Sequence, residues 1–212
     1  MEKLFYKTIK EHIEYEIPKI KWSKFIGNVF HVENKKKAEK YLKQIQEKYR
    51  DATHSCYAYH YGANVNYDLF GNLDLIPEYT KQSDKGEPTN TAGKPILAQI
   101  KLHNLYNILI VVTRYFWGTM LGIGGLIQAY GECAKQVIQQ SKIIETEIMK
   151  KISCIYDFDL LQTVRNVVNK YNAKIIEEKY DKDVHMTIKV NSWCLEAFKK
   201  ELFENSKGQI KI

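Results

Sequence analysis

A glycine-rich segment between Val112 and Tyr130 constrains this 212-residue chain more strongly than any other part. Four of the chain's eleven glycines lie within eight residues of it: Gly118, Gly122, Gly124 and Gly125. Because glycine adopts backbone conformations that other residues avoid, the cluster predicts a tight, side-chain-poor connection between two regular elements. The apolar run before it predicts a strand over residues 107–113, and the run after it predicts a helix over residues 126–141.

The groups beside these glycines favour binding of an anion. Backbone N–H groups ahead of a helix and the planar guanidinium of Arg114 both match phosphate or carboxylate, and Tyr115 offers a ring for stacking on a base. The candidate binding residues of this segment are Arg114, Tyr115, Gly118, Thr119, Gly122, Gly124 and Gly125. A structural interpretation stays open, in which the glycines serve packing and the aromatic residues fill the core. Neither a Walker P-loop nor a GxGxxG fingerprint is present.

Three further candidates lie in the stretch SDKGEPTNTAGKP at residues 83–95. The carboxylates of Asp84 and Glu87, with Asp51, could serve as a general base or hold Mg²⁺. The expectation we favour is structural: Asp84 bonds to nearby backbone N–H groups, Glu87 balances charge at the start of the next helix, and Thr91 caps that helix. Both interpretations remain open at this point.

His54, Cys56 and His60 project from the same face of a predicted strand, which raises the question of a zinc site. At the rise of a strand the two histidines would lie about 20 Å apart, too far to share an ion. A nucleophilic Cys56 would lack a third group to orient its histidine base. We therefore assign no metal, no cofactor and no catalytic residue, and keep His54 only among the candidate partner-binding residues.

Composition and charge narrow the functional classes. The four cysteines are scattered and form no CxxC pair, as in proteins with reduced thiols. Neither a run of about 20 apolar residues nor a signal peptide is evident, so we expect a cytoplasmic protein that does not cross a membrane. Residues 1–50 carry 13 Lys and Arg against 7 Asp and Glu, and hence most of the net charge of +7. This basic start either attracts a polyanion such as RNA or is a solvated helix face.

Periodicity in the first part of the chain predicts a strand over residues 22–32, a helix over 34–50 capped by Asn34, and a strand over 53–61. The turn-rich, polar residues 62–88 predict a long loop. A helix carrying Ile96, Leu97, Ile100 and Leu105 should follow it.

After Ile143 the pattern becomes a regular alternation of short elements. Strands are predicted over 148–156, 173–180 and 185–190, helices over 158–171 and 192–205, and a last strand over 209–212. The order βαββαβ is that of a ferredoxin-like domain. The chain is therefore predicted to be an α+β protein of two domains, 1–142 and 143–212.

Three motifs carry a family resemblance: DATHSCYAY at 51–59, SDKGEPTNTAGKPIL at 83–97 and VTRYFWGTMLGIGGLIQAY at 112–130. Together they resemble the IMPACT/YigZ family over essentially the whole chain. The resemblance implies an N-terminal α/β sandwich similar to the second domain of a small-subunit ribosomal protein, and a C-terminal ferredoxin-like domain similar to a part of elongation factor G. This chain departs from the family pattern at Trp117, where a glycine is usual, and at Met120, where a basic residue is usual.

The resemblance also implies a function, because eukaryotic members of the family regulate translation. We expect a non-enzymatic factor whose N-terminal domain binds the ribosome, RNA or a translation factor. The alternative is an enzyme or binding protein for a nucleotide or a phosphorylated small molecule, with Arg114 and the glycines holding the phosphate.

Overall fold

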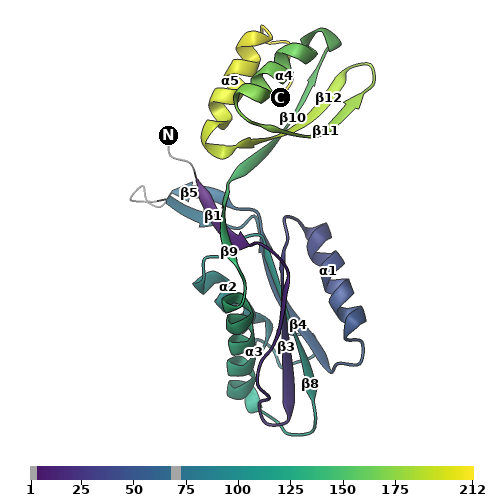
Figure 1. Ribbon diagram of the computed structural model, residues 1–212, viewed down its shortest axis with the longest axis vertical. Coiled ribbons are helices and arrows are strands. Elements are labelled where there is room, and N and C mark those ends of the chain that lie inside the picture. Colours follow the sequence, from purple (N-terminus) through teal and green to yellow (C-terminus); the bar gives the residue numbers. More distant parts are fainter. Residues whose placement is uncertain (1–3, 68–72) are drawn as a thin grey trace. The chain divides into compact units, whose positions relative to one another are not determined.

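The structure is a computed structural model that describes residues 4–67 and 73–212. It divides into two compact units, one comprising Tyr6–Thr146 and the other built around Glu147–Ile212 (Figure 1). Both units combine helices with antiparallel sheets, so the predicted fold class, α+β with two domains, is confirmed.

A five-stranded antiparallel sheet forms the centre of the first unit. Its strands, in spatial order, are β2 (Ile13–Glu16), β3 (Ser23–His31), β8 (Ile108–Phe116), β4 (His54–Tyr61) and β7 (Tyr79–Ser83). One face packs against α2 (Gly93–Leu102) and α3 (Gly122–Gln139), and the other packs against α1 (Lys35–Lys48) (Figure 1). The sheet is therefore buried on both sides along its middle strands.

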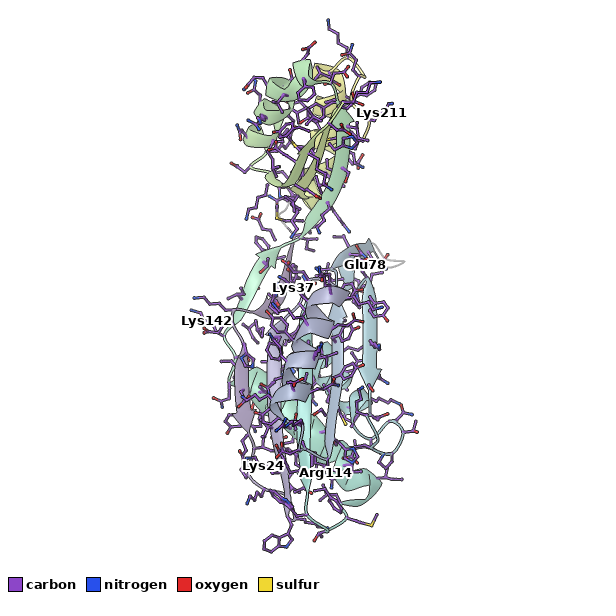
Figure 2. All side chains as sticks on the ribbon, turned by 90° about the vertical axis from the view of Figure 1, so that its right-hand side faces the viewer. Lys24, Lys37, Glu78, Arg114, Lys142 and Lys211 are labelled. Carbon is purple, nitrogen blue, oxygen red and sulfur yellow. The ribbon has the colours of Figure 1, made fainter. Side chains whose placement is uncertain are left out.

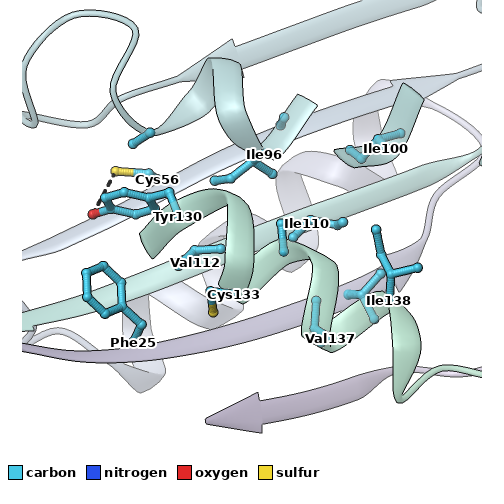
Figure 3. Packing of buried hydrophobic residues seen from close by; sticks show 14 of the residues in the cluster. Phe25, Cys56, Ile96, Ile100, Ile110, Val112, Tyr130, Cys133, Val137 and Ile138 are labelled. Atoms are coloured by element: carbon cyan, nitrogen blue, oxygen red, sulfur yellow. Dashed lines mark hydrogen bonds between the residues drawn. The ribbon is translucent and has the colours of Figure 1, made fainter. Parts of the chain in front are cut away.

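The apolar sequence of β8 follows from its central place in this sheet. Ile110 and Val112 belong to the core beneath α2 and α3, where Figure 3 shows them beside Cys133 and Val137 of α3. Leu109 and Val111, on the alternate positions, point to the opposite face and pack towards α1. A strand covered on both faces needs apolar side chains at every position rather than at alternate ones.

Several predicted elements of this unit are confirmed. The predicted strands over 22–32 and 53–61 are β3 and β4, and the helix predicted over 34–50 is α1. The side chain of Asn34 accepts a hydrogen bond from the backbone N–H of Lys37, as expected of an N-cap. A short pair of strands, β1 (Phe5–Ile9) and β9 (Ile143–Glu147), was not predicted.

The prediction of one long loop over residues 62–88 is wrong. The segment contains the hairpin of β5 (Asn64–Tyr67) with β6 (Leu73–Ile76), and then β7, while residues 68–72 lie outside the described part. β7 is an edge strand whose residues are mostly exposed, so it has none of the apolar alternation that a sequence pattern detects.

The helix expected from residue 126 begins earlier, at Gly122. Gly122, Gly124 and Gly125 thus lie in the first turn of α3 and not in a loop ahead of it. The first N–H groups of a helix have no partner inside the helix, so weak helix formers cost little at this end. The preceding helix, α2, ends at Leu102, and Leu105 is buried beyond it.

The second unit has the predicted βαββα order: β10 (Met149–Tyr156), η1 (Phe158–Leu160) with α4 (Leu161–Lys170), β11 (Lys174–Tyr180), β12 (Val184–Asn191), and η2 (Ser192–Cys194) with α5 (Leu195–Asn205). Its sheet has the order β10-β12-β11 and is antiparallel. The predicted last strand is reduced to a single bridge between Lys211 and Ile155, on the free side of β10. With that bridge as the fourth strand, the order is that of a ferredoxin-like sheet.

Candidate functional site

Arg114 lies near the end of β8, on the face of the sheet that α2 and α3 cover, and only 5% of its side chain is exposed. Its Nη1 donates to Oε1 of Glu87 at 2.7 Å, and its Nη2 donates to Oγ of Ser23 at 3.1 Å. The guanidinium also lies over the rings of Phe116 at 4.8 Å and Phe25 at 5.6 Å. Its charge is therefore neutralised and enclosed within the protein.

Glu87 is the centre of a buried polar network. Its Oε1 also accepts a hydrogen bond of 2.8 Å from the hydroxyl of Tyr130, and Nε2 of His54 lies 4.0 Å away. The thiol of Cys56 donates to the carbonyl of Asp84 at 2.8 Å and approaches the Tyr130 hydroxyl at 3.5 Å (Figure 3). Burial raises the pKa of Tyr130, and it raises the pKa of Cys56 to about 12, so both groups stay protonated.

The expectation that Arg114 is open to an external anion is wrong. The anion that it binds is Glu87, from the same chain, because a buried cation is stable only beside an internal partner. The alternative function, a phosphate site built on Arg114 and the glycines, loses its cation with this finding. Both residues were singled out in the sequence, but nothing in the sequence indicated that they pair.

Asp84 has the structural role that was expected of it. Its Oδ1 accepts hydrogen bonds from the backbone N–H groups of Ala92 at 2.9 Å and Gly93 at 2.8 Å, and its Oδ2 accepts one from Asn90 at 2.9 Å. Asp84 thus caps the start of α2, although it lies several residues before the helix in the sequence. The prediction that Thr91 caps this helix is wrong, because its hydroxyl donates to the carbonyl of Pro88 instead.

The three candidates on β4 have separate surroundings. His54 bonds through Nδ1 to the Lys85 carbonyl, Cys56 belongs to the buried network, and Nε2 of His60 donates to the carbonyl of Leu105. Burial lowers the pKa of His60. Among the described residues, no group of three or more His, Cys, Asp or Glu side chains is placed to hold a metal ion. Within the same residues, no helix combines the length and apolar character needed to cross a membrane.

The other residues of the glycine-rich segment reach the surface. Gly118, Thr119, Gly122 and Gly124 are exposed, and the hydroxyl of Tyr115 donates to Asp51 at 2.9 Å. A Cβ added at Gly118, Gly122 or Gly124 would meet no atom within 4 Å. These three glycines therefore leave the backbone accessible, whereas a Cβ added at Gly125 would lie 3.1 Å from Cβ of Leu121.

Large apolar side chains surround these glycines at the end of the unit, in a surface that sequence reasoning missed. We call it the tip, and it consists of Trp22, Trp117, Met120, Ile123 and Ile127. Ser23 pairs with Phe116 at the end of β3 and β8, so Trp22 and Trp117 follow directly beyond this pair. Figure 2 shows Lys24 and Arg114 at this end of the sheet. The two departures from the family pattern, Trp117 and Met120, were the signal available in the sequence.

Comparison with known proteins extends over both units. The family model described as the Impact N-terminal domain matches residues 21–138, and a domain of unknown function, DUF1949, matches residues 154–209. An IMPACT family member of Haemophilus influenzae is 32% identical, with 94% of this chain and 96% of that protein covered. The IMPACT family member YvyE of Bacillus subtilis is also 32% identical, with 98% and 89% covered.

A solved structure shares the fold over the whole chain. The crystal structure of a hypothetical protein, 25% identical in sequence, covers 100% of this chain and 97% of its own, with a TM-score of 0.74. The N-terminal family model spans more than half of the chain, and the two relatives align over nearly their whole lengths. The chain therefore belongs to the IMPACT family.

Proposed function

We propose that this protein is a non-enzymatic, translation-associated factor that binds a protein surface of the ribosome through the tip of its N-terminal domain. The link with translation is supported by the family resemblance. The choice of surface and of partner chemistry is argued from the geometry of the first unit.

The exposure of the tip is the observation that carries this proposal. Trp22 is 71% exposed, Met120 83% and Ile123 66%, although each side chain is large and apolar. Contiguous exposed apolar residues mark interaction sites, and Trp and Met are enriched where proteins bind proteins. Since the guanidinium of Arg114 is enclosed, the tip suits an apolar protein surface better than a phosphate.

Backbone strain supports the same interpretation. Lys21 and Trp22 have φ values of 41° and 56°, in the left-handed region that L-residues adopt at a cost of roughly 1 kcal/mol or more each. The strained turn holds the indole of Trp22 out into solvent, where it contributes little to the core. Strain of this kind is typical of sites that serve a function.

The surroundings of the tip would assist recognition. The ammonium of Lys19 lies 5.3 Å from the ring of Trp117, which places a cation beside the apolar residues. Exposed backbone at Gly118 and Gly122 permits close approach of a partner. Charges at the rim of an interface mainly accelerate association, whereas the buried aromatic residues supply the affinity.

Co-sedimentation with purified ribosomes tests the proposal. The variant W22A/W117A/M120A should lose binding at least tenfold, while L102A, which removes an equally exposed residue (71%) from α2, should bind as the unaltered protein does. Binding should persist when the salt concentration is raised, because apolar contacts are not screened. Equal binding by all three proteins, or absence of every one of them from the ribosome pellet at low salt, would refute the proposal.

A functional measurement complements the binding assay. In cell-free translation of a reporter, excess unaltered protein should change the yield of product, and the W22A/W117A/M120A variant should not. A matching change with the tip variant would show that the effect does not pass through this surface.

A further inference from the structure

A groove in the first unit lies between α1 and residues 10–12, the turn that joins β1 to β2. Its volume is about 510 Å³, within the usual range for ligand-binding pockets. His31, the last residue of β3, is part of its wall, whereas the tip adjoins Ser23, the first residue of that strand. The groove is therefore a separate place from the tip.

His12 is an exposed residue of this groove, yet its imidazole is held in one position. Its Nε2 donates to Oδ1 of Asn28 at 2.9 Å, and its ring stacks on Phe30 with a centroid distance of 4.2 Å and an interplanar angle of 3°. Asn28 is fully buried, and its Nδ2 has no hydrogen-bond partner among the described residues. A buried N–H group without a partner costs stability. The arrangement thus orients an exposed ring at a cost to the fold.

The helical wall of the groove adds a second ring and an amide. Tyr41 of α1 stacks on Phe30 at a centroid distance of 4.5 Å, and Gln44 follows one turn later on the same helix. Histidine and tyrosine rings stack on unpaired bases, and a carboxamide can both donate to and accept from the edge of a base. The groove therefore combines the groups that hold a single unpaired base.

A stripe of lysines on α1 runs beside the groove. Lys36, Lys40 and Lys43 are exposed, and their spacing of four and three residues places them along one side of the helix. Lys40 lies three residues after Lys37 and four before Gln44, both of which line the groove. The stripe extends over about 10 Å of the helix axis, at about 1.5 Å per residue.

The lysines of this stripe are not neutralised within the described part of the chain. The other lysines of α1 have carboxylates within 4.0 Å: Lys35 with Glu39, Lys37 with Glu33 and Lys48 with Glu14. No described carboxylate lies within that distance of the three stripe lysines or of Lys10 in the opposite wall. Glu11 contributes the one carboxylate of the lining. The stripe and the groove together thus keep an excess of positive charge.

The start of α1 adds to the cost of this charge. Residues 35–37 are all lysines, and the first turn has no acidic residue. The N-terminus of a helix carries partial positive charge, which disfavours cations there. Lys36 and Lys40 are in addition like charges at i and i+4, which destabilise a helix. A bound anion would relieve both effects.

We propose that this groove and the lysine stripe bind single-stranded RNA, as a second binding surface beside the tip. One unpaired base occupies the groove against the rings of His12 and Tyr41, and the neighbouring phosphates lie along the stripe. The choice of RNA over DNA rests on the proposed function, because it follows from the link with translation.

The chemistry of the surface argues against two other polyanions. A helix that binds a membrane surface combines its cations with exposed apolar side chains, and every exposed residue of α1 is polar or charged. An acidic protein surface would match the lysines, but it would leave the oriented imidazole of His12 and the groove unused. A duplex would present no free base to the groove.

Fluorescence anisotropy with the full-length protein and a labelled oligouridine of about 20 nucleotides tests the phosphate contacts. The variant K36Q/K40Q/K43Q should bind at least tenfold more weakly at about 100 mM salt. Its slope of log Kd against log salt concentration should fall by about 2, since each phosphate contact on a single strand contributes about 0.7.

A matched control changes the same charge elsewhere in the first unit. Lys85, Lys94 and Lys101 are exposed, lie before or on α2, and have no described carboxylate within 4.0 Å. Because α2 covers the opposite face of the sheet, K85Q/K94Q/K101Q should alter binding less than twofold. Equal losses in the two lysine variants would overturn the assignment.

The groove is tested by removing its polar and aromatic groups without changing a lysine. H12A/Q44A should bind the oligouridine at least fivefold more weakly with an unaltered salt slope, because stacking and base contacts are lost and phosphate contacts are not. Q44A alone should give a smaller loss in the same direction. Unchanged binding by both variants would show that no base enters the groove.

Further measurements separate this inference from its competitors. The K36Q/K40Q/K43Q variant should melt at the same or a slightly higher temperature, which excludes misfolding as the cause of weaker binding. The W22A/W117A/M120A variant should bind the oligouridine normally, and since this assay contains no ribosome, it and the co-sedimentation test can fail separately. Tighter binding to a duplex, to a matched DNA strand, to phosphatidylserine vesicles or to polyglutamate would overturn the assignment to single-stranded RNA.

Discussion

The two halves of the glycine-rich segment have opposite environments in the same unit. Residues 112–116 end the central strand and turn Arg114 into a network that Glu87 and Tyr130 complete inside the protein. Trp117, Met120 and Ile123 are exposed at the surface, beside glycines at 118, 122 and 124 where an added Cβ would meet no atom. The residues with the most recognisable chemistry thus stabilise the fold, and the chemically plain residues form the exposed surface. An ionic or nucleophilic residue type in a sequence is therefore weak evidence of a site until its burial is known.

Breaking the buried pair should give the largest effect on stability. Arg114→Met leaves the Glu87 carboxylate enclosed without its cation, and removal of one partner from a buried ion pair typically costs about 3–5 kcal/mol. Urea denaturation of the variant measures this loss. The double variant E87Q/R114M should recover part of it, because the uncompensated charge is gone. A loss below about 1 kcal/mol for Arg114→Met would mean that this half of the segment is not structural.

Removing one hydroxyl from the network should cost less. Tyr130→Phe keeps the ring in the core beside Phe25 but deletes the hydrogen bond to Glu87. A hydrogen bond to a charged group contributes about 1.5–3 kcal/mol, and denaturation midpoints report it. The variant should also bind ribosomes normally. Impaired ribosome binding with unchanged stability would assign the network a direct part in recognition.

Loss of the distant helix cap should have an intermediate to small effect. Asp84→Ala removes the acceptor of three backbone N–H groups at the start of α2, and loss of a cap costs about 0.5–2 kcal/mol. Hydrogen exchange should show faster exchange at Ala92 and Gly93 in particular. Asp84→Asn, which keeps one acceptor oxygen, should lose less. Unaltered exchange at these amides in the alanine variant would contradict the cap.

The smallest effect is expected in the exposed half, with the opposite sign. Gly124 lies in the first turn of α3, and an added Cβ meets no atom within 4 Å. Gly124→Ala should therefore raise the free energy of unfolding by about 0.5 kcal/mol through the better helix propensity of alanine. Thermal denaturation detects the change. A clear destabilisation would show that this glycine is needed for packing, and the contrast between the two halves would weaken.

Much of the fold could be predicted from the sequence, because burial leaves periodic patterns in β3, α1 and the elements of the second unit. β7 escaped prediction because an exposed edge strand is held by main-chain bonds and carries polar side chains. The candidate site was harder. The sequence identified Arg114 and Glu87 but not that they pair, because they lie 27 positions apart and only the fold brings them into contact. The tip was missed because the sequence does not show where the turn between β2 and β3 ends. The end of that turn decides whether an apolar residue such as Trp22 is exposed.

The strained turn at Trp22 and the open first turn of α3 position the tip. The exposed side chains of the tip are not part of the hydrophobic core. On the proposed function, partner choice is thereby uncoupled from folding in this architecture. Related proteins can retarget the same scaffold by exchanging a few outward-facing residues, and the buried ion pair behind them need not change.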